Sequence, residues 1–187
     1  HPEHPELGTR KVPFARELFI EREDFMEDPP KKFFRLSVGR EVRLRWAYFL
    51  TCTGVEKDAA GNITGLRATI DPATRGGDSP DGRKVKGTIH WVSADHAKTA
   101  EVRLFDRLFK TEEPGKATGQ WQDDLNPASL ETIEARIEPA AADLPVGTRV
   151  QFERTGYFCV DPDSKPGKPV FNRTVTLKDT WAKEATK

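Results

Sequence analysis

The sequence has little cysteine and no long apolar run. Its 187 residues include only Cys52 and Cys159, too few for a disulfide framework, and no CxxC-type spacing indicates a zinc site. No apolar run approaches the roughly 18 residues of a membrane span, and residues 1–10 lack the apolar core of a signal peptide. These absences predict a cytoplasmic protein with no membrane partner.

Charge of one sign is not in excess either. The 30 Lys and Arg residues equal the 30 Asp and Glu residues, so the formal net charge is zero. Nucleic-acid contact would then depend on local clustering of basic residues rather than on a basic field around the whole chain.

Recognisable enzyme motifs are also missing. There is no GxSxG, HExxH or P-loop, and neither His90 nor His96 has a nucleophile beside it in a known motif. We therefore predict no catalytic residue and no metal site. Because there is no initiator Met and residues 1–5 (HPEHP) read as a linker, we expect a piece of a longer protein whose N-terminal part carries the chemistry.

What the sequence does contain is apolar alternation with a period of two, which is typical of strands. Gly- and Pro-rich turns such as 58–62 and 71–82 separate the alternating segments. The fold class predicted is all-β with few short helices, one of them at 94–100, and the length fits two small barrels. The expected strands lie at 12–20, 42–50, 66–70, 85–91, 102–108, 133–137, 150–152 and 175–177.

Basic residues cluster in one segment, 31–46, which holds six Lys and Arg side chains against the single acid Glu41. If Val42, Leu44 and Trp46 face the core, Arg43 and Arg45 project together from the other face, about 6.6 Å apart. Two guanidinium groups on one strand suit phosphate contact or bidentate reading of a splayed base. The alternative is that they only solubilise an exposed face.

Phe33 and Phe34, in the same segment, are predicted to be core residues rather than stacking platforms.

A second candidate cluster is 151–154 (QFER). Gln151 and Glu153 share a face, where an amide and a carboxylate suit the edges of a base. Arg154 points inward unless the strand bends, and Gly156 would permit a bulge. An ordinary surface strand explains the same pattern. The last strand has a polar face formed by Thr174, Thr176, Lys178 and Thr180, for which β-propensity is a sufficient explanation.

Several stretches resemble the bacterial glutaminyl-tRNA synthetase family, in order and along almost the whole chain. They are 11–14 (KVPF), 36–45 (LSVGREVRLR), 81–93 (DGRKVKGTIHWVS), 103–109 (RLFDRLF), 151–160 (QFERTGYFCV) and 169–183 (PVFNRTVTLKDTWAK). The resemblance implies two β-barrels similar to ribosomal protein L25, at 1–76 and 85–187. They would follow a catalytic Rossmann domain, not present here, that uses ATP and magnesium to join glutamine to tRNA.

The resemblance also implies a partner, tRNA-Gln, whose three anticodon bases lie in separate pockets. Arg43 and Arg45 match the arginine pair for the first base, and Arg35 matches a basic residue at the third base, with Lys32 nearby. No DNA partner is implied, and we expect a monomer.

The middle base corresponds to Gln151, Glu153 and Arg154, and the family threonine of the DTW motif corresponds to Thr180, with Lys178 beside it. An arginine of this pocket would lie upstream of the first residue, so we expect weaker and less selective binding than in a full enzyme.

Two departures concern the other pockets. Lys32, Phe33 and Phe34 replace polar or basic residues around the third base, and Trp46 replaces a frequent asparagine.

Three other interpretations remain open. An L25-like protein that binds ribosomal RNA would have the same fold. A β-sandwich enzyme with acid catalysis at Asp123 or Asp124 belongs to another class. The eukaryotic or archaeal glutamyl enzyme shares the barrels, although 151–160 and 171–181 favour the glutaminyl type.

Overall fold

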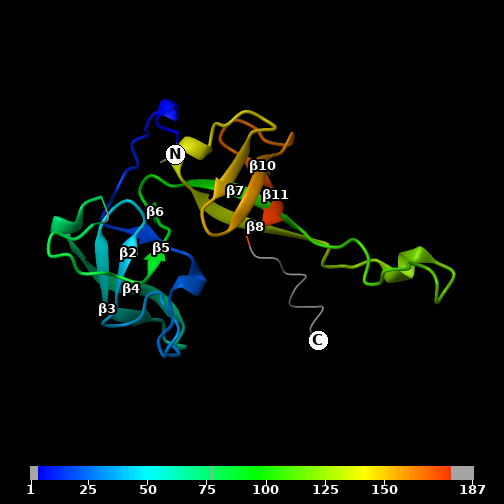
Figure 1. Ribbon diagram of the computed structural model, residues 1–187. Helices are drawn as coiled ribbons and strands as arrows, with labels where there is room; N and C mark the ends of the chain where they lie inside the picture. The colour runs from blue at the N-terminus through cyan, green and yellow to red at the C-terminus, as the bar shows by residue number, and fades with distance from the viewer. Residues whose placement is uncertain (1–3, 77, 178–187) are drawn as a thin grey trace. The chain divides into compact units, whose positions relative to one another are not determined.

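The computed structural model describes residues 4–76 and 78–177, and these form strands joined by turns and five short 3-10 helices (Figure 1). The strands are β1 (Leu18–Phe19), β2 (Glu41–Leu44), β3 (Phe49–Lys57), β4 (Ile63–Asp71), β5 (Thr88–Ile89), β6 (Val92–Ser93), β7 (Lys98–Phe105), β8 (Leu130–Ile137), β9 (Arg149–Phe152), β10 (Gly156–Val160) and β11 (Val170–Thr176). The 3-10 helices are η1 (Pro5–Leu7), η2 (Arg22–Asp24), η3 (Pro72–Thr74), η4 (Trp121–Asp124) and η5 (Pro139–Ala141). No helix in the described ranges is both long enough and apolar enough to cross a membrane.

The chain packs as two compact units. Residues 14–94 form one, here called the inserted unit, and the described residues before 14 and after 94 form the other, here called the flanking unit.

The inserted unit contains a four-stranded sheet in the order β4-β3-β2-β5 and a small β1-β6 ladder. β2 pairs antiparallel with β3 and parallel with β5. Alternation along β2 buries Val42 and Leu44 completely, whereas Glu41 and Arg43 stay partly exposed. Ile89 and Trp91 add to this core from the β5 side.

The β3–β4 hairpin follows the turn chemistry of its sequence. Asp58 accepts hydrogen bonds on one carboxylate oxygen from the amides of Ala60 (2.9 Å) and Asn62 (2.8 Å). Gly61 has φ +85°, a left-handed conformation that glycine adopts without steric cost. The turn predicted at 58–62 is therefore confirmed.

The flanking unit is built on a five-stranded sheet in the order β8-β7-β11-β10-β9, in which β7 and β11 run parallel. Phe171 is fully buried and packs against Phe152, with 5.1 Å between ring centroids. Arg10 donates two hydrogen bonds to the carboxylate of Glu138, which joins the first described residues to this unit.

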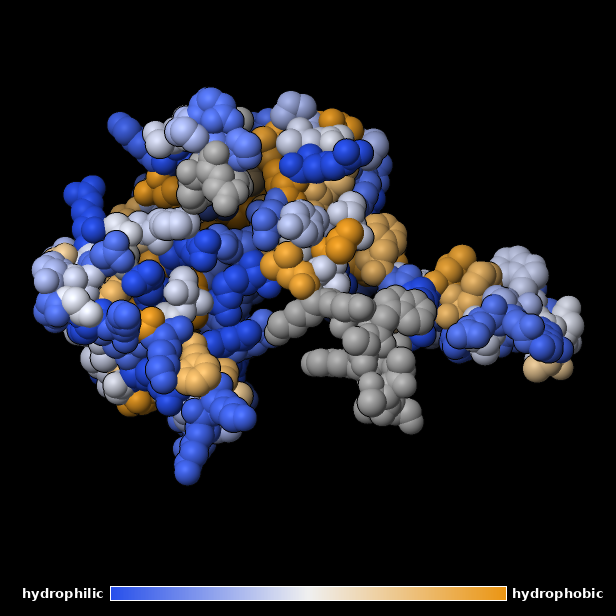
Figure 2. Space-filling view, viewed as in Figure 1, coloured by the Kyte–Doolittle hydropathy of each residue, from blue (hydrophilic) through white to orange (hydrophobic). Residues whose placement is uncertain are grey.

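Between β7 and β8 the chain extends away from its own sheet, as Figure 1 shows in green. Phe109 and Trp121 meet edge to face at 6.2 Å within this segment. Its surface carries apolar side chains such as Leu108, and Figure 2 shows orange areas along it.

The predicted all-β class with two small β units is confirmed, with sheets that stay open rather than closing into continuous barrels. Some details were wrong. The strand expected at 12–20 is only β1, and of the one expected at 85–91 only β5 is formed, with β6 following it. The short helix expected at 94–100 is a turn leading into β7, whose pairing with β8 along its whole length overrides the weak local helical preference.

Candidate nucleic-acid interface

Arg43 and Arg45 lie at the end of β2, and the neighbouring β5 segment fixes their backbone. The amide of Arg43 donates to the Gly87 carbonyl (2.8 Å) and that of Arg45 to the Ile89 carbonyl (3.0 Å). Amides two residues apart that bond the same neighbouring strand belong to side chains on one face. The shared face predicted for the two arginines therefore extends through Arg45, although β2 itself ends one residue earlier.

Aromatic rings hold both guanidinium groups. The guanidinium carbon of Arg43 lies 5.3 Å from the ring centroid of the fully buried Phe49, and that of Arg45 lies 4.7 Å from the Trp46 ring. The Trp91 indole nitrogen donates to the Arg45 carbonyl (3.1 Å). The two ring contacts restrict the arginine rotamers, so less entropy would be lost when the guanidinium groups bind a ligand.

The predicted core position of Trp46 was wrong. The chain turns after Leu44, and the Ala47 amide donates to the Leu44 carbonyl (2.9 Å). Trp46 has φ 61° and is 65% exposed. The alternation at 42–50 therefore belongs to two antiparallel strands and the turn that joins them, not to one strand.

Arg83 is the charged centre that sequence reasoning missed. It donates two hydrogen bonds to Glu41 (both 3.0 Å) and further ones to Asp71 (2.5 Å) and Asp81 (2.7 Å). These carboxylates raise the pKa of Arg83, with Glu41 the largest cause. Hydrogen bonds from Ser79, and then from Arg83, lower the pKa of Asp81 to about 2.

Arg83 thus neutralises acids close to the predicted arginines, and its guanidinium carbon lies 5.2 Å from the same Phe49 ring as Arg43. The acids that bind Arg83 come from three separate chain segments, so no local sequence pattern predicted this cluster. The only signal was its place in the stretch 81–93 that carries the resemblance.

Arg35 is engaged with η2. Its Nη1 donates to the Glu23 carbonyl (3.0 Å) and lies 3.3 Å from the carboxylate of Asp24, which is 1% exposed. A buried carboxylate requires a counter-charge, so Arg35 stabilises this part of the inserted unit. Lys32 is exposed close by in the sequence.

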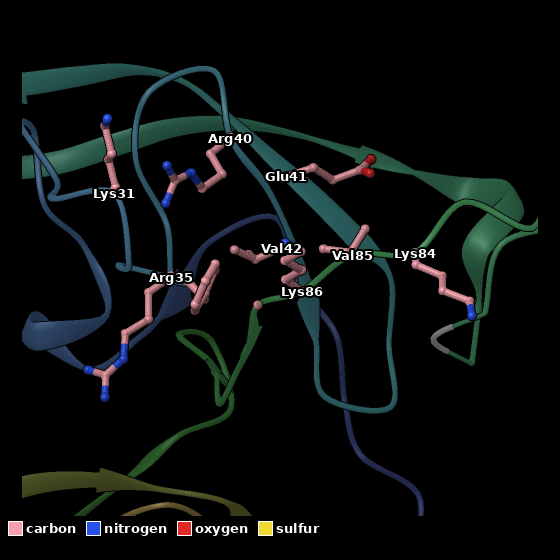
Figure 3. Close-up of a pocket in the computed structure, with 10 residues that line it drawn as sticks. Lys31, Arg35, Arg40, Glu41, Val42, Lys84, Val85 and Lys86 are labelled. Atoms are coloured by element: carbon pink, nitrogen blue, oxygen red, sulfur yellow. The ribbon is translucent and has the colours of Figure 1, made fainter.

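A basic groove of about 330 Å³ lies where 31–42 meet 84–87 (Figure 3). Its charged lining consists of Lys31, Arg35, Arg40, Glu41, Lys84 and Lys86. Figure 3 shows Arg40 and Glu41 leaving the start of β2 in opposite directions, and Glu41 is the acid bound by Arg83. The groove is therefore positively charged.

Phe34 also lines this groove, and its predicted core position was wrong. The side chain is 51% exposed, whereas Phe33 is half-buried. The Nζ atom of Lys86 lies 5.3 Å from the Phe34 ring centroid.

The middle-base set lies in the flanking unit. Gln151 is exposed on β9, and the chain then turns through Glu153 and Arg154 into β10, with Arg154 at φ 68°. The bend that sequence reasoning allowed for is present, and the β10–β11 register shifts after Tyr157. Tyr157 is 46% exposed and pairs across the ladder with Gln151, which makes it a candidate contact that sequence reasoning missed.

Lys178 and Thr180 lie outside the described residues. Within the described ranges, no group of three or more His, Cys, Asp or Glu side chains is arranged to hold a metal ion. Asp124 accepts a hydrogen bond from the Gly115 amide (2.8 Å), which gives this carboxylate a structural role in its loop.

Comparison with known proteins identifies the family. Two domain families, both described as "tRNA synthetases class I (E and Q), anti-codon binding domain", match residues 1–71 and 88–161. The chain belongs to this family. The resemblance drawn from the sequence is therefore confirmed.

Several glutamine–tRNA ligases are similar to almost the whole of this chain. The protein of Nitrobacter hamburgensis is 60% identical over 99% of this chain and 33% of its own length. Those of Bradyrhizobium diazoefficiens and Rhodopirellula baltica are 56% and 55% identical over 100% and 98% of this chain, and over 33% and 31% of their own lengths. The chain spans about a third of the length of these relatives.

Membership of the anticodon-binding domains favours tRNA binding over the ribosomal interpretation and over acid catalysis at Asp123 or Asp124. It leaves the roles of individual residues as predictions.

Proposed function

We propose that this chain recognises the anticodon loop of tRNA-Gln as part of a glutamine–tRNA ligase. The observation that carries the proposal is 60% identity to such a ligase over 99% of the chain, within a family of anticodon-binding domains. Anticodon bases are unstacked and single-stranded, so their edges are available to side chains.

The first base would be bound at the end of β2. Arg43 and Arg45 offer planar donors held against Phe49 and Trp46, which suits bidentate contact with a base edge or a phosphate. Arg35 and Lys32 would contact the third base. Arg35 would then bind the RNA while it also pairs with the buried Asp24.

The middle base would be bound in the flanking unit. Gln151 offers both donor and acceptor atoms, and Glu153 offers acceptors for base amino groups. Arg154 would add charge from the turn. Thr180 and Lys178 complete the proposed set.

Catalysis would belong to the remainder of the full-length protein, where a Rossmann domain would bind ATP and magnesium to attach glutamine. The chain described here should not aminoacylate tRNA by itself. We propose that it is a cytoplasmic monomer without DNA or membrane partners.

The test measures binding of the 187-residue chain to a tRNA-Gln anticodon stem-loop and to one with a substituted middle base, over a range of salt concentrations. We expect tighter binding of the matched loop, and a fall in affinity with salt for both loops as counterions are released. Equal affinity for both loops with the same salt slope would refute recognition by the chain itself.

A further inference from the structure

Arg83 lies close to the predicted first-base arginines, but its own donors are fully used. A guanidinium group has five N–H donors and no acceptor. The side chain of Arg83 makes five hydrogen bonds: two to Glu41 (both 3.0 Å), one to Asp71 (2.5 Å), one to Asp81 (2.7 Å) and one to the Ser79 hydroxyl (3.0 Å). Arg83 therefore has no donor left for RNA, and any effect on binding has to act through the groups that it holds.

Two of the acids that Arg83 holds share a face of the sheet with Arg43. Alternation along β2 places Glu41 on that face, about 6.6 Å along the strand from Arg43. Across the sheet, Arg43 pairs with Phe49 and Phe49 pairs with Asp71, and residues directly opposite each other project to the same side. A carboxylate on this face competes with RNA for Arg43 unless another cation holds it.

Arg43 and Arg83 also share an aromatic ring. Their guanidinium carbons lie 5.3 Å and 5.2 Å from the ring centroid of Phe49, which is fully buried. Because this ring lies on the face that carries Arg43, the two guanidinium groups help to cover it. Loss of Arg83 would uncover one side of the ring and weaken the support of Arg43.

Arg43 makes a longer ionic contact than those of Arg83. Its Nη2 atom lies 3.6 Å from the carboxylate of Asp78, a side chain that is 99% exposed. Ion pairs exposed to solvent are weak, so a ligand displaces this one readily. Arg43 is thus available to RNA while Arg83 keeps the better placed acids occupied.

We propose that Arg83 is a positioning residue for anticodon recognition, which keeps Glu41 away from Arg43 and supports the Phe49 ring without touching the RNA. This inference rests on the proposed function and gives Arg83 a role that the resemblance does not. Its effect is confined to the first anticodon base, which Arg43 and Arg45 are proposed to bind.

Glu41 is the acid that loss of the Arg83 side chain would set free. Asp71 also accepts a hydrogen bond from the Ala73 amide (3.0 Å), and Asp81 accepts one from the Arg83 amide (3.0 Å), so both keep a partner. The Glu41 carboxylate is bound by the Arg83 guanidinium. A second change at Glu41 therefore separates the positioning role from the stability that Arg83 gives to the fold.

The first experiment measures binding of the 187-residue chain to the matched stem-loop and to one with a substituted first anticodon base. Arg83→Ala should lower the ratio of the two affinities about 5-fold, the lower end of what one bidentate base contact provides. Adding Glu41→Gln to Arg83→Ala should restore part of this ratio, because a neutral amide forms no ion pair with Arg43. A double variant that discriminates no better than Arg83→Ala would overturn the proposal.

Arg103→Ala is the matched control. In the flanking unit, Arg103 is likewise held by carboxylates, those of Glu101 (2.8 Å) and Asp163 (2.7 Å). Its removal takes away the same charge and should leave the first-base ratio unchanged. Arg83→Ala should also leave unchanged the ratio for a loop with a substituted middle base. Equal losses in both variants, or at both bases in Arg83→Ala, would indicate a general effect of charge or stability and overturn the positioning role.

Urea unfolding first establishes that each variant is folded under the conditions of the binding assay. If Arg83→Ala does not fold, Arg83→Gln replaces it with the same expected result, since the amide keeps two N–H donors for the remaining acids. If wild type distinguishes the first-base loops and the folded Arg83 variant does so equally well, the positioning role fails and the proposed function stands. If wild type distinguishes none of the loops, the proposed function itself fails.

Discussion

Both units join two antiparallel strands by a four-residue turn, and in both the turn contains a residue predicted to bind a base. In the inserted unit the turn is 44–47, closed by a hydrogen bond of 2.9 Å, and its third residue, Trp46, has φ 61°. In the flanking unit the turn is 152–155, closed at 3.0 Å, and its third residue, Arg154, has φ 68°. These are the two described non-glycine residues with positive φ.

The two turns use the strained position differently. In the inserted unit it holds an aromatic residue whose ring lies 4.7 Å from the guanidinium carbon of Arg45. In the flanking unit it holds the arginine itself. Type II turns favour glycine at this position, so a tryptophan or an arginine there costs stability. Strained backbone of this kind concentrates at functional sites. In the inserted unit the strained residue orients the neighbouring Arg45 through its ring, whereas in the flanking unit the strained residue is Arg154.

The largest expected effect tests whether each unit depends on its own buried ring. Phe49→Ala and Phe171→Ala each remove a fully buried ring and should cost about 3–5 kcal/mol of unfolding free energy. Amide hydrogen exchange should show lost protection in the inserted unit for Phe49→Ala and in the flanking unit for Phe171→Ala. Phe105→Ala, at a half-exposed ring of the flanking unit, is the control with little effect. Equal loss in both units from either core variant would contradict two separate cores.

The next effect concerns which base each turn reads. Arg45→Ala should reduce discrimination at the first anticodon position, and Arg154→Ala at the middle position, each by about 1–3 kcal/mol. Binding to stem-loops with single substitutions at each position measures this. Arg67→Ala serves as control, since that side chain is 70% exposed on β4 and is paired with Glu56. A uniform loss of affinity for all loops would instead indicate contact with a phosphate.

Predictions from the sequence were most reliable where one chain segment carries the whole signal. Alternation located β4 and β9, and the Asp58 turn followed from local hydrogen bonding. The shared face of Arg43 and Arg45 was also a local property. Alternation placed Gln151 on the outward face of its strand, and the resemblance added the expected role of Gln151 and Arg154 at the middle base.

The failures arose where distant segments meet. Alternation at 42–50 is the same for one strand as for two strands and a turn, and nothing local indicated that Trp46 adopts positive φ. The carboxylates around Arg83 come from positions 41, 71 and 81, which only the folded sheet brings together. Phe34 is 51% exposed, and the backbone of Gly87, more than fifty residues away in the sequence, approaches its carbonyl group.

A smaller effect measures the strain in the two turns. Glycine normally costs stability relative to alanine, but at Trp46 and Arg154 the glycine variant should be more stable than the alanine variant by about 1 kcal/mol. Comparing glycine with alanine at the same position separates backbone strain from loss of the side chain. Urea unfolding of the four variants gives the values. Thr53, on β3 without positive φ, is the control position, where alanine should be the more stable. If the alanine variant is the more stable one at Trp46 or Arg154 as well, the backbone of that turn is not strained.

The smallest effect compares the acid sensitivity of the two units. Ser79 and Arg83 lower the pKa of Asp81 to about 2 in the inserted unit. In the flanking unit, the amide of Asp163 and the side chain of Asn172 lower the pKa of Asp161, with a contribution from Arg103. A carboxylate whose pKa is depressed by folding stabilises the protein above its ordinary pKa of 3.8, and this contribution disappears as the pH falls through the folded value.

For Asp81 the loss should therefore occur between about pH 4 and pH 2. Asp81→Asn and Asp161→Asn should each lower stability near neutral pH and flatten the decline in acid, which urea unfolding from pH 6 to pH 2 measures. Glu112→Gln, at an exposed loop carboxylate, is the control. Ser79 and Arg83 lie close in sequence to Asp81, whereas Asn172 reaches Asp161 from β11. A Ser79→Ala variant should therefore raise the pKa of Asp81 part of the way back to its ordinary value without disturbing the sheet. An Asp81 carboxyl resonance that titrates identically in wild type and Ser79→Ala would show that Arg83 alone sets this pKa.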